Sequence, residues 1–187
     1  MVDLKELISV DYDKLTARLS KGKIVERRLS EIKDSFLQPE LAEKMVATED
    51  PLVYRVTAVE PASGEGDLHY GLGIIFPGKV GDEYFLTKGH LHEARETAEV
   101  YIGLSGEGYM LLEDEQTLET RMEPLGKGKI VYVPGHTAHR TVNTGKESLT
   151  YFGIYPANAG HDYGAIGKRN FLKVIVDQNG TPTLKDR

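Results

Sequence analysis

The spacing of apolar residues divides the chain into two parts of different character. Between residues 3 and 20, and again between residues 34 and 48, apolar residues recur every three or four positions. The second segment places Leu37, Leu41 and Met45 at this spacing. Such spacing predicts amphipathic helices, because it gathers the apolar side chains on one helix face. We therefore expect residues 1–48 to form a helical extension that packs on the rest of the chain.

From residue 52 the pattern changes to short segments rich in β-branched and aromatic residues, separated by glycine and proline turns. The expected strands cover residues 52–59, 69–76, 84–87, 100–104, 109–113, 128–133, 140–143, 149–155, 171–176 and 181–184. Short strands with turns at this spacing predict an all-β sandwich or barrel. We expect residues 49–187 to form this barrel, and the chain of 187 residues to be one domain overall.

Composition narrows the classes of function. The net charge is −6 and the basic residues are scattered, so the concentrated basic face that nucleic-acid binding needs is not expected. No apolar run approaches a membrane span of roughly 18 residues and no secretory signal is evident, which predicts a cytoplasmic protein. Cysteine is absent, so a metal site must use nitrogen and oxygen ligands. Few Gln and Asn residues beside abundant Lys and Glu are typical of heat-adapted proteins.

A candidate metal site lies in the segment that contains His90, His92 and Glu99. Residues two apart in an extended strand point to the same side, so both imidazoles can reach one ion. Glu99 begins the next apolar strand and shares a face with Tyr101. Imidazole and carboxylate together suit a transition metal such as Fe, Mn, Ni, Co or Zn. In a closed barrel, His139 on a distant strand can lie beside this motif as a further ligand.

Three other side chains compete for a place in the site. Glu96 is a rival carboxylate, but it precedes the apolar strand and is expected in a loop, so we favour Glu99. His136 is interpreted as a turn residue, with an auxiliary ligand as the alternative. His69 is interpreted as a polar side chain on a strand, outside the metal site.

The two segments resemble the paired motifs of the cupin superfamily. Beyond the three histidines and Glu99, the family landmarks fall in register at Gly106, Gly128, Pro134 and Asn143, whereas His136 and Tyr84 stand where glycines are usual. The resemblance implies a cupin (double-stranded β-helix or jelly-roll) barrel. It also implies one divalent transition metal per chain, bound by His90, His92, Glu99 and His139. We expect Fe²⁺ first, with Mn²⁺, Ni²⁺ or Zn²⁺ as alternatives.

A closer resemblance covers residues 50–165. Phe76-Pro-Gly-Lys-Val-Gly81, Thr87-Lys-Gly-His-Leu-His92, Ala138-His-Arg-Thr-Val-Asn143 and Ile154-Tyr-Pro-Ala-Asn-Ala-Gly-His-Asp-Tyr-Gly164 are similar to the archaeal cupin-type glucose-6-phosphate isomerases. This resemblance implies a sugar-phosphate substrate and a homodimer. It places Tyr54, Thr87 and Gly89 near the phosphate, and Tyr101, Tyr155, His161 and Tyr163 around the sugar. Glu99, Tyr101 and His161 would be catalytic. One contact differs: Gly73 stands where the family can have threonine.

The expected chemistry leaves two routes and two other functions open. Isomerisation moves a hydrogen between C1 and C2, with a metal as Lewis acid. Glu99 would be the base of an enediol route. A metal-bound carboxylate is a weaker base, so a hydride shift is the alternative. The same ligands would also suit an Fe(II)-dependent cupin dioxygenase, which consumes oxygen. A non-catalytic sugar-binding cupin would bind the sugar phosphate without turnover.

Overall fold

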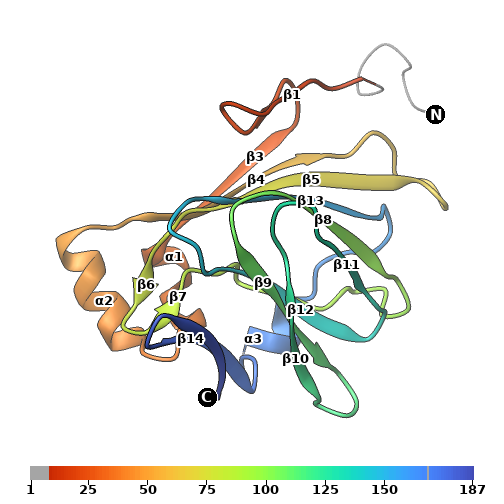
Figure 1. The fold of residues 1–187 in the computed structure, drawn as a ribbon. Coiled ribbons are helices and arrows are strands. Elements are labelled where there is room, and N and C mark those ends of the chain that lie inside the picture. Colours follow the sequence, from red (N-terminus) through yellow and green to blue (C-terminus); the bar gives the residue numbers. More distant parts are fainter. Residues whose placement is uncertain (1–8, 168) are drawn as a thin grey trace.

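The chain folds into a barrel of two β-layers with short helices at one end (Figure 1). The computed structural model describes residues 9–167 and 169–187. The larger layer is an antiparallel sheet of six strands in the order β11-β8-β13-β5-β4-β3. These strands are β3 (Lys23–Arg28), β4 (Leu52–Val59), β5 (Leu68–Ile75), β8 (Glu99–Ser105), β11 (Ile130–Val133) and β13 (Leu149–Pro156).

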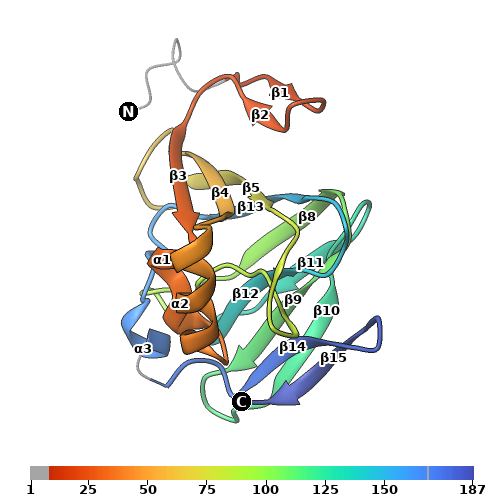
Figure 2. The same cartoon turned by 90° about the vertical axis from the view of Figure 1, so that its left-hand side faces the viewer.

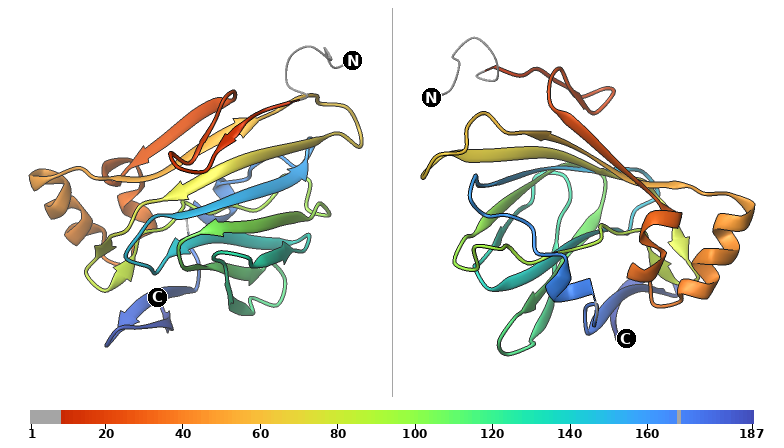
Figure 3. Two further views of the ribbon diagram at one scale, coloured as in Figure 1. Left: turned by 45° about the horizontal axis from the view of Figure 1, so that its top comes forward. Right: turned by 180° about the vertical axis from the view of Figure 1, so that it is seen from behind.

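Two smaller sheets form the opposite layer (Figure 3). One contains β9 (Gly108–Asp114) between β10 (Thr120–Pro124) and β12 (Thr137–Asn143). The other contains β6 (Lys79–Val80), β7 (Glu83–Tyr84), β14 (Lys173–Gln178) and β15 (Thr181–Asp186). Isolated bridges pair Leu86 with Val142 and His90 with His139. They hold the extended segment after β7 alongside β12.

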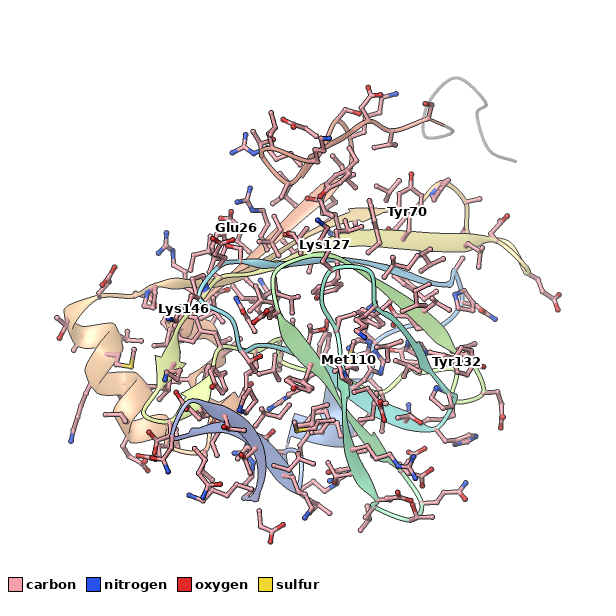
Figure 4. The ribbon with its side chains drawn as sticks, viewed as in Figure 1. Glu26, Tyr70, Met110, Lys127, Tyr132 and Lys146 are labelled. Carbon is pink, nitrogen blue, oxygen red and sulfur yellow. The ribbon has the colours of Figure 1, made fainter. Side chains whose placement is uncertain are left out.

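Alternation along the strands decides which side chains fill the interior. In β11, Val131 and Val133 are buried, whereas Ile130 and Tyr132 are exposed. Figure 4 shows Met110 inside the barrel and Tyr132 at its outer edge. Removing the inward apolar side chains from water stabilises the barrel by roughly 25 cal/mol per Å² of buried surface. The expected all-β barrel is therefore confirmed.

The helix expected between residues 3 and 20 is wrong over the described part, residues 9–20; residues 3–8 lie outside the described residues. Instead, β1 (Tyr12–Asp13) and β2 (Arg18–Leu19) form a hairpin. The Asp13 carboxylate accepts hydrogen bonds from the Leu15 N–H at 2.9 Å and the Thr16 hydroxyl at 2.6 Å. Such local bonds compete with a helix. Leu15 is 90% exposed, so no buried apolar face compensates.

The helix expected between residues 34 and 48 is confirmed as α2 (Pro39–Thr48), which begins with proline at a favourable position. It follows α1 (Leu29–Ile32) and η1 (Lys33–Ser35), and Figure 2 shows α1 and α2 side by side at one end of the barrel. Strand β3 was not expected, yet it pairs with β4. The first 48 residues thus contribute a strand to the main sheet, and the division at residue 48 stays a prediction.

All ten expected strands are present, with ends shifted by up to three residues. Besides β3 and the β1–β2 hairpin, the sequence prediction missed β6, β10, α1 and α3 (Gly164–Gly167). The first of these has two residues, and β10 is a largely polar edge strand, so neither has an apolar alternation that would reveal it. In the described residues, no helix is long and apolar enough to cross a membrane.

Candidate metal centre and active site

Three elements bring the four predicted metal ligands together. His90 and His92 lie on the extended segment after β7, Glu99 is the first residue of β8, and His139 lies on β12. The bridge between His90 and His139 has N–H···O distances of 3.2 and 3.0 Å. One nitrogen or carboxylate oxygen from each of the four residues lies within 4.8 Å of the others. The register of β12 therefore decides that His139 joins the first motif.

Hydrogen bonds behind the imidazoles direct their Nε2 atoms toward one point. Nδ1 of His92 lies 3.0 Å from the carbonyl of Thr97, and Nδ1 of His139 lies 3.1 Å from the carbonyl of Thr137. A carbonyl accepts only from a protonated nitrogen, so each Nδ1 carries a hydrogen, and the two bonds turn each Nε2 toward the Glu99 carboxylate, the arrangement seen in many metal sites. The buried Nε2 of His90 has no hydrogen-bond partner in the described structure, and the buried Nε2 of His139 has only the Glu99 carboxylate, at 3.2 Å. Unpartnered buried nitrogens are costly, and a metal ion would satisfy them.

Charge in the cluster also suits a cation. Burial opposes ionisation of Glu99, but His139 and His92 beside its carboxylate lower its pKa to about 2. Oε2 of Glu99 lies 3.2 Å from Nε2 of each of these histidines. Burial, together with the neighbouring imidazoles, lowers the pKa of His90 well below its usual value. An ionised carboxylate and a neutral imidazole are the protonation states that bind metal.

A cavity of about 230 Å³ adjoins this cluster. Its wall contains every residue expected at the substrate: Tyr54, Thr87, Gly89, Tyr101, Tyr155, His161 and Tyr163. Backbone bonds between Leu91 and Asp162, with N···O distances of 3.3 and 2.8 Å, place the segment of His161 beside the metal motif. The His161 ring centroid lies 4.5 Å from that of His90. Co-localisation is thus observed, while the individual roles stay predictions.

Tyr151 and Arg140 are among the residues of the cavity wall that the sequence prediction missed. Tyr151 lies on the same face of β13 as Gly153 and Tyr155, because the three residues are spaced two apart. Its ring centroid lies 5.3 Å from that of Tyr101. The period of two along this strand is a signal that could have found it. Arg140 is 2% exposed, and only the tertiary structure brings it to the cavity.

The turn at Gly89 presents backbone and cationic groups to one end of the cavity. Gly89 has φ +76°, and a Cβ there would lie 2.7 Å from the ring of Phe171. Only glycine meets both demands without strain. The Arg140 guanidinium donates to the Lys88 carbonyl at 2.6 Å, and burial lowers its pKa to about 9, so it stays charged at neutral pH. Nζ of Lys88 lies 5.0 Å from the ring centre of Tyr163.

The competing side chains lie elsewhere. The Glu96 side chain is 89% exposed, and its Oε1 lies 2.9 Å from Nε2 of His136. His136 has φ +58° and also pairs with Glu115, so it is a turn residue outside the four-residue cluster. His69 lies 2.6 Å from the Ala62 carbonyl, on the strand where it was expected.

Arg95 connects the metal segment with the segment of His161. Its Nε donates to Glu115 at 3.0 Å, and Nη2 donates to Asp162 at 2.5 Å. A third bond reaches the His92 carbonyl. Because charge-assisted bonds are stronger than neutral ones, this guanidinium holds Asp162 against the metal motif.

Among solved structures, two of oxalate oxidase resemble this fold at 15% identity, with TM-scores of 0.51 and 0.52. The alignments cover 63% and 66% of this chain, and 58% and 62% of those chains. At such identity the likeness concerns the fold alone, and it supports the expected cupin barrel.

Sequence comparison reaches further. The family model described as "Glucose-6-phosphate isomerase (GPI)" matches residues 26–186. Glucose-6-phosphate isomerase of Pyrococcus abyssi is 46% identical over 182 residues, which are 97% of this chain and 96% of that protein. The enzyme of Thermococcus litoralis is 44% identical over 97% of this chain and 95% of its own length. This chain therefore belongs to the glucose-6-phosphate isomerase (GPI) family.

Proposed function

We propose that this protein is a metal-dependent aldose–ketose isomerase (EC 5.3.1.9) that interconverts glucose 6-phosphate and fructose 6-phosphate, in glycolysis and gluconeogenesis. The observation that supports this proposal most strongly is the cluster of His90, His92, Glu99 and His139 beside a cavity lined by tyrosines and His161. Such a cavity matches a small polyhydroxylated ligand in size and in hydrogen-bonding groups. The names of the relatives point to the same reaction.

The bound metal would supply Lewis acidity to the oxygens at C1 and C2. Glu99, ionised and 5% exposed, is the group that would move a proton between these carbons. Burial raises the pKa of Tyr101 well above its usual value, so its hydroxyl stays protonated and would donate to a sugar oxygen. Burial lowers the pKa of His161, so its imidazole is neutral near pH 7 and able to accept a proton.

The phosphate would lie at the end of the cavity near Tyr54, Thr87 and Gly89. Thr87 accepts a bond from the Thr141 N–H at 3.0 Å through its hydroxyl oxygen, which leaves the hydroxyl hydrogen free to donate. Lys23, Arg27 and Lys88 line the same cavity, in a protein whose net charge is −6. Local cations of this kind attract a dianion despite the overall charge. Tyr155 and Tyr163 would contact the sugar hydroxyls.

We assign one divalent transition metal per chain, Fe²⁺ in first place and Mn²⁺, Ni²⁺ or Zn²⁺ as alternatives, because imidazole with carboxylate suits this group of ions. Metal analysis of purified protein, followed by chelation and reconstitution with each ion, tests the assignment. We further propose that the protein is a homodimer, which light scattering tests. We propose that it is heat-adapted and cytoplasmic, without nucleic-acid or membrane partners.

The decisive experiment is a coupled assay of glucose 6-phosphate formation from fructose 6-phosphate, before and after chelation. We expect activity that EDTA abolishes and a divalent metal restores. Full activity in metal-free protein contradicts the metal's role. Oxygen consumption without isomerisation would favour the dioxygenase alternative, and binding of fructose 6-phosphate without turnover under any metal would favour a sugar-binding cupin.

The same assay run in D₂O separates the two routes for hydrogen transfer. If Glu99 carries the hydrogen as a proton, exchange with solvent introduces carbon-bound deuterium at C1 or C2 of the product, which stays after the hydroxyl deuterium is washed out in H₂O. A hydride shift between C1 and C2 introduces none. Mass spectrometry of the product measures the difference.

A further inference from the structure

Three small residues lie in register across the main sheet, on the face that lines the cavity. Gly153 on β13 pairs with Tyr101 on one side and with Gly71 on the other. Gly71 in turn pairs with Ala58 on β4. All three line the cavity. The row therefore forms a shallow trough that begins beside Tyr101, with Glu99 two residues earlier on β8.

Packing explains why two glycines of the cavity wall, Gly153 and Gly73, carry no side chain. A Cβ at Gly153 would lie 2.6 Å from Oε1 of Glu99. At Gly73, on the next row, a Cβ would lie 2.5 Å from the hydroxyl oxygen of Tyr151 and closer still to its ring. Real side chains do not approach so closely, so each glycine makes room for a neighbouring residue of the protein itself.

Gly71 is different, because no contact among the described residues requires a glycine there. A Cβ there would lie 3.4 Å from Cγ1 of Val56 and 3.7 Å from the carbonyl oxygen of Thr57, which are ordinary contact distances. Its φ lies outside the left-handed region that favours glycine. Its pairing with both neighbouring strands runs without a register shift, so it marks no bulge.

A glycine inside a strand weakens the strand, and it often marks a bulge, a sharp bend or a close approach of backbone or ligand. The register of β5 is continuous at Gly71, and within residues 9–167 and 169–187 no protein atom lies nearer to its added Cβ than Val56 Cγ1, so a ligand is the remaining reason for the glycine. We propose that Gly71 is a specificity-determining residue, which keeps space for the reactive C1–C2 end of a six-carbon sugar phosphate beside Glu99. This inference rests on the proposed function and names the residue that admits the sugar chain.

The trough lies well away from the proposed phosphate end. On β4, Tyr54 and Ala58 are four residues apart, which corresponds to about 13 Å along a strand. Gly71 pairs with Ala58 and not with Tyr54, and through Gly153 it lies level with Tyr101, next to the Glu99 side chain that reaches Gly153. A methyl group at residue 71 should therefore obstruct the sugar chain and leave phosphate binding unchanged.

The test compares Gly71→Ala and Gly71→Ser with the parent protein and with Gly167→Ala. The last variant adds the same methyl group where, apart from its neighbours in the chain, no atom of the described residues lies within 4 Å. For each protein, the metal content, the Tm, turnover, the Kd for fructose 6-phosphate by calorimetry and the competitive inhibition constant of inorganic phosphate are measured.

Both Gly71 variants should keep the metal and unfold at or above the parent Tm, because the new side chain meets no clash. Their Kd for fructose 6-phosphate should rise at least fivefold, while the inhibition constant of inorganic phosphate stays within twofold. Gly167→Ala should match the parent in each ligand measurement.

A Kd for fructose 6-phosphate within twofold of the parent in both Gly71 variants overturns the inference. A fall of Tm with loss of metal overturns it equally, since the glycine would then serve packing. Turnover by the parent protein tests the proposed function separately. If the parent binds fructose 6-phosphate without turnover, the Kd ratios still decide the role of Gly71; if it does not bind, both proposals fail.

Discussion

Exchanging the carboxylate of Glu99 for an amide tests the proposed centre most directly, and Glu96 offers a matched control three residues away. Glu99→Gln keeps the size of the side chain and one oxygen ligand but removes the negative charge. In the parent protein, Glu99 is 5% exposed and its carboxylate lies 3.2 Å from Nε2 of both His92 and His139. Water therefore cannot replace the missing charge beside the metal or the reacting carbons.

General base catalysis contributes on the order of 10²–10⁴-fold to a rate. We therefore expect kcat of Glu99→Gln to fall at least about a hundredfold, which corresponds to about 2.7 kcal/mol in the activation barrier. The metal should be held more weakly, so kcat is measured at saturating metal, with metal content determined in parallel. This arrangement separates a loss of metal from a loss of proton transfer.

In Glu96→Gln, by contrast, the altered side chain is 89% exposed and contacts His136 at 2.9 Å. Exposed substitutions of this kind change stability little, so kcat should stay within about twofold and Tm within about 2 °C. A hundredfold loss in Glu96→Gln, or a kcat within tenfold of the parent in metal-loaded Glu99→Gln, would refute the assignment. Either result would mean that Glu99 is not the carboxylate that binds the metal and moves the proton.

Three further predictions follow from contacts around the site. Gly73→Ala should lower the free energy of unfolding by about 1–3 kcal/mol, measured in urea, because its Cβ must displace the Tyr151 ring; unchanged stability would contradict this packing. Arg95→Met should raise KM for fructose 6-phosphate several-fold with metal retained, because the segment of His161 loses its anchor. Arg95→Lys should restore part of the effect, and equal kinetics in both variants would exclude a positioning role. Hydrogen bonds to Glu96 and Glu115 raise the pKa of His136, so its NMR titration midpoint should lie above 6.5 and fall in Glu96→Gln. Because the folded-state pKa is raised, the His136 contribution to stability is present in full below pH 6.5 and is lost as pH rises through the folded-state pKa. The stability difference between the parent and Glu96→Gln should therefore shrink at higher pH, and a difference that grows would contradict this pH dependence.

The sequence by itself determined the class of fold and the four candidate metal ligands that the structure brings together. Strand periodicity and turns located the barrel because a period of two exposes one face of each strand to the core. The two motifs named His90, His92, Glu99 and His139 because their spacing is local within each motif, and Glu99 was separated from Glu96 by the apolar strand that follows it.

Only the tertiary structure decided the contacts between segments far apart in the chain. The N-terminal hairpin replaced a helix because Asp13 makes local bonds and Leu15 finds nothing to pack against. Arg140 reached the cavity through strand register. Gly71 shows the same limit most clearly. The sequence does not reveal whether a glycine within a strand avoids a clash with a neighbouring side chain, forms a bulge or leaves space for a ligand. The physical difference lies in which atoms surround its missing side chain, and pairing across the sheet alone sets those atoms.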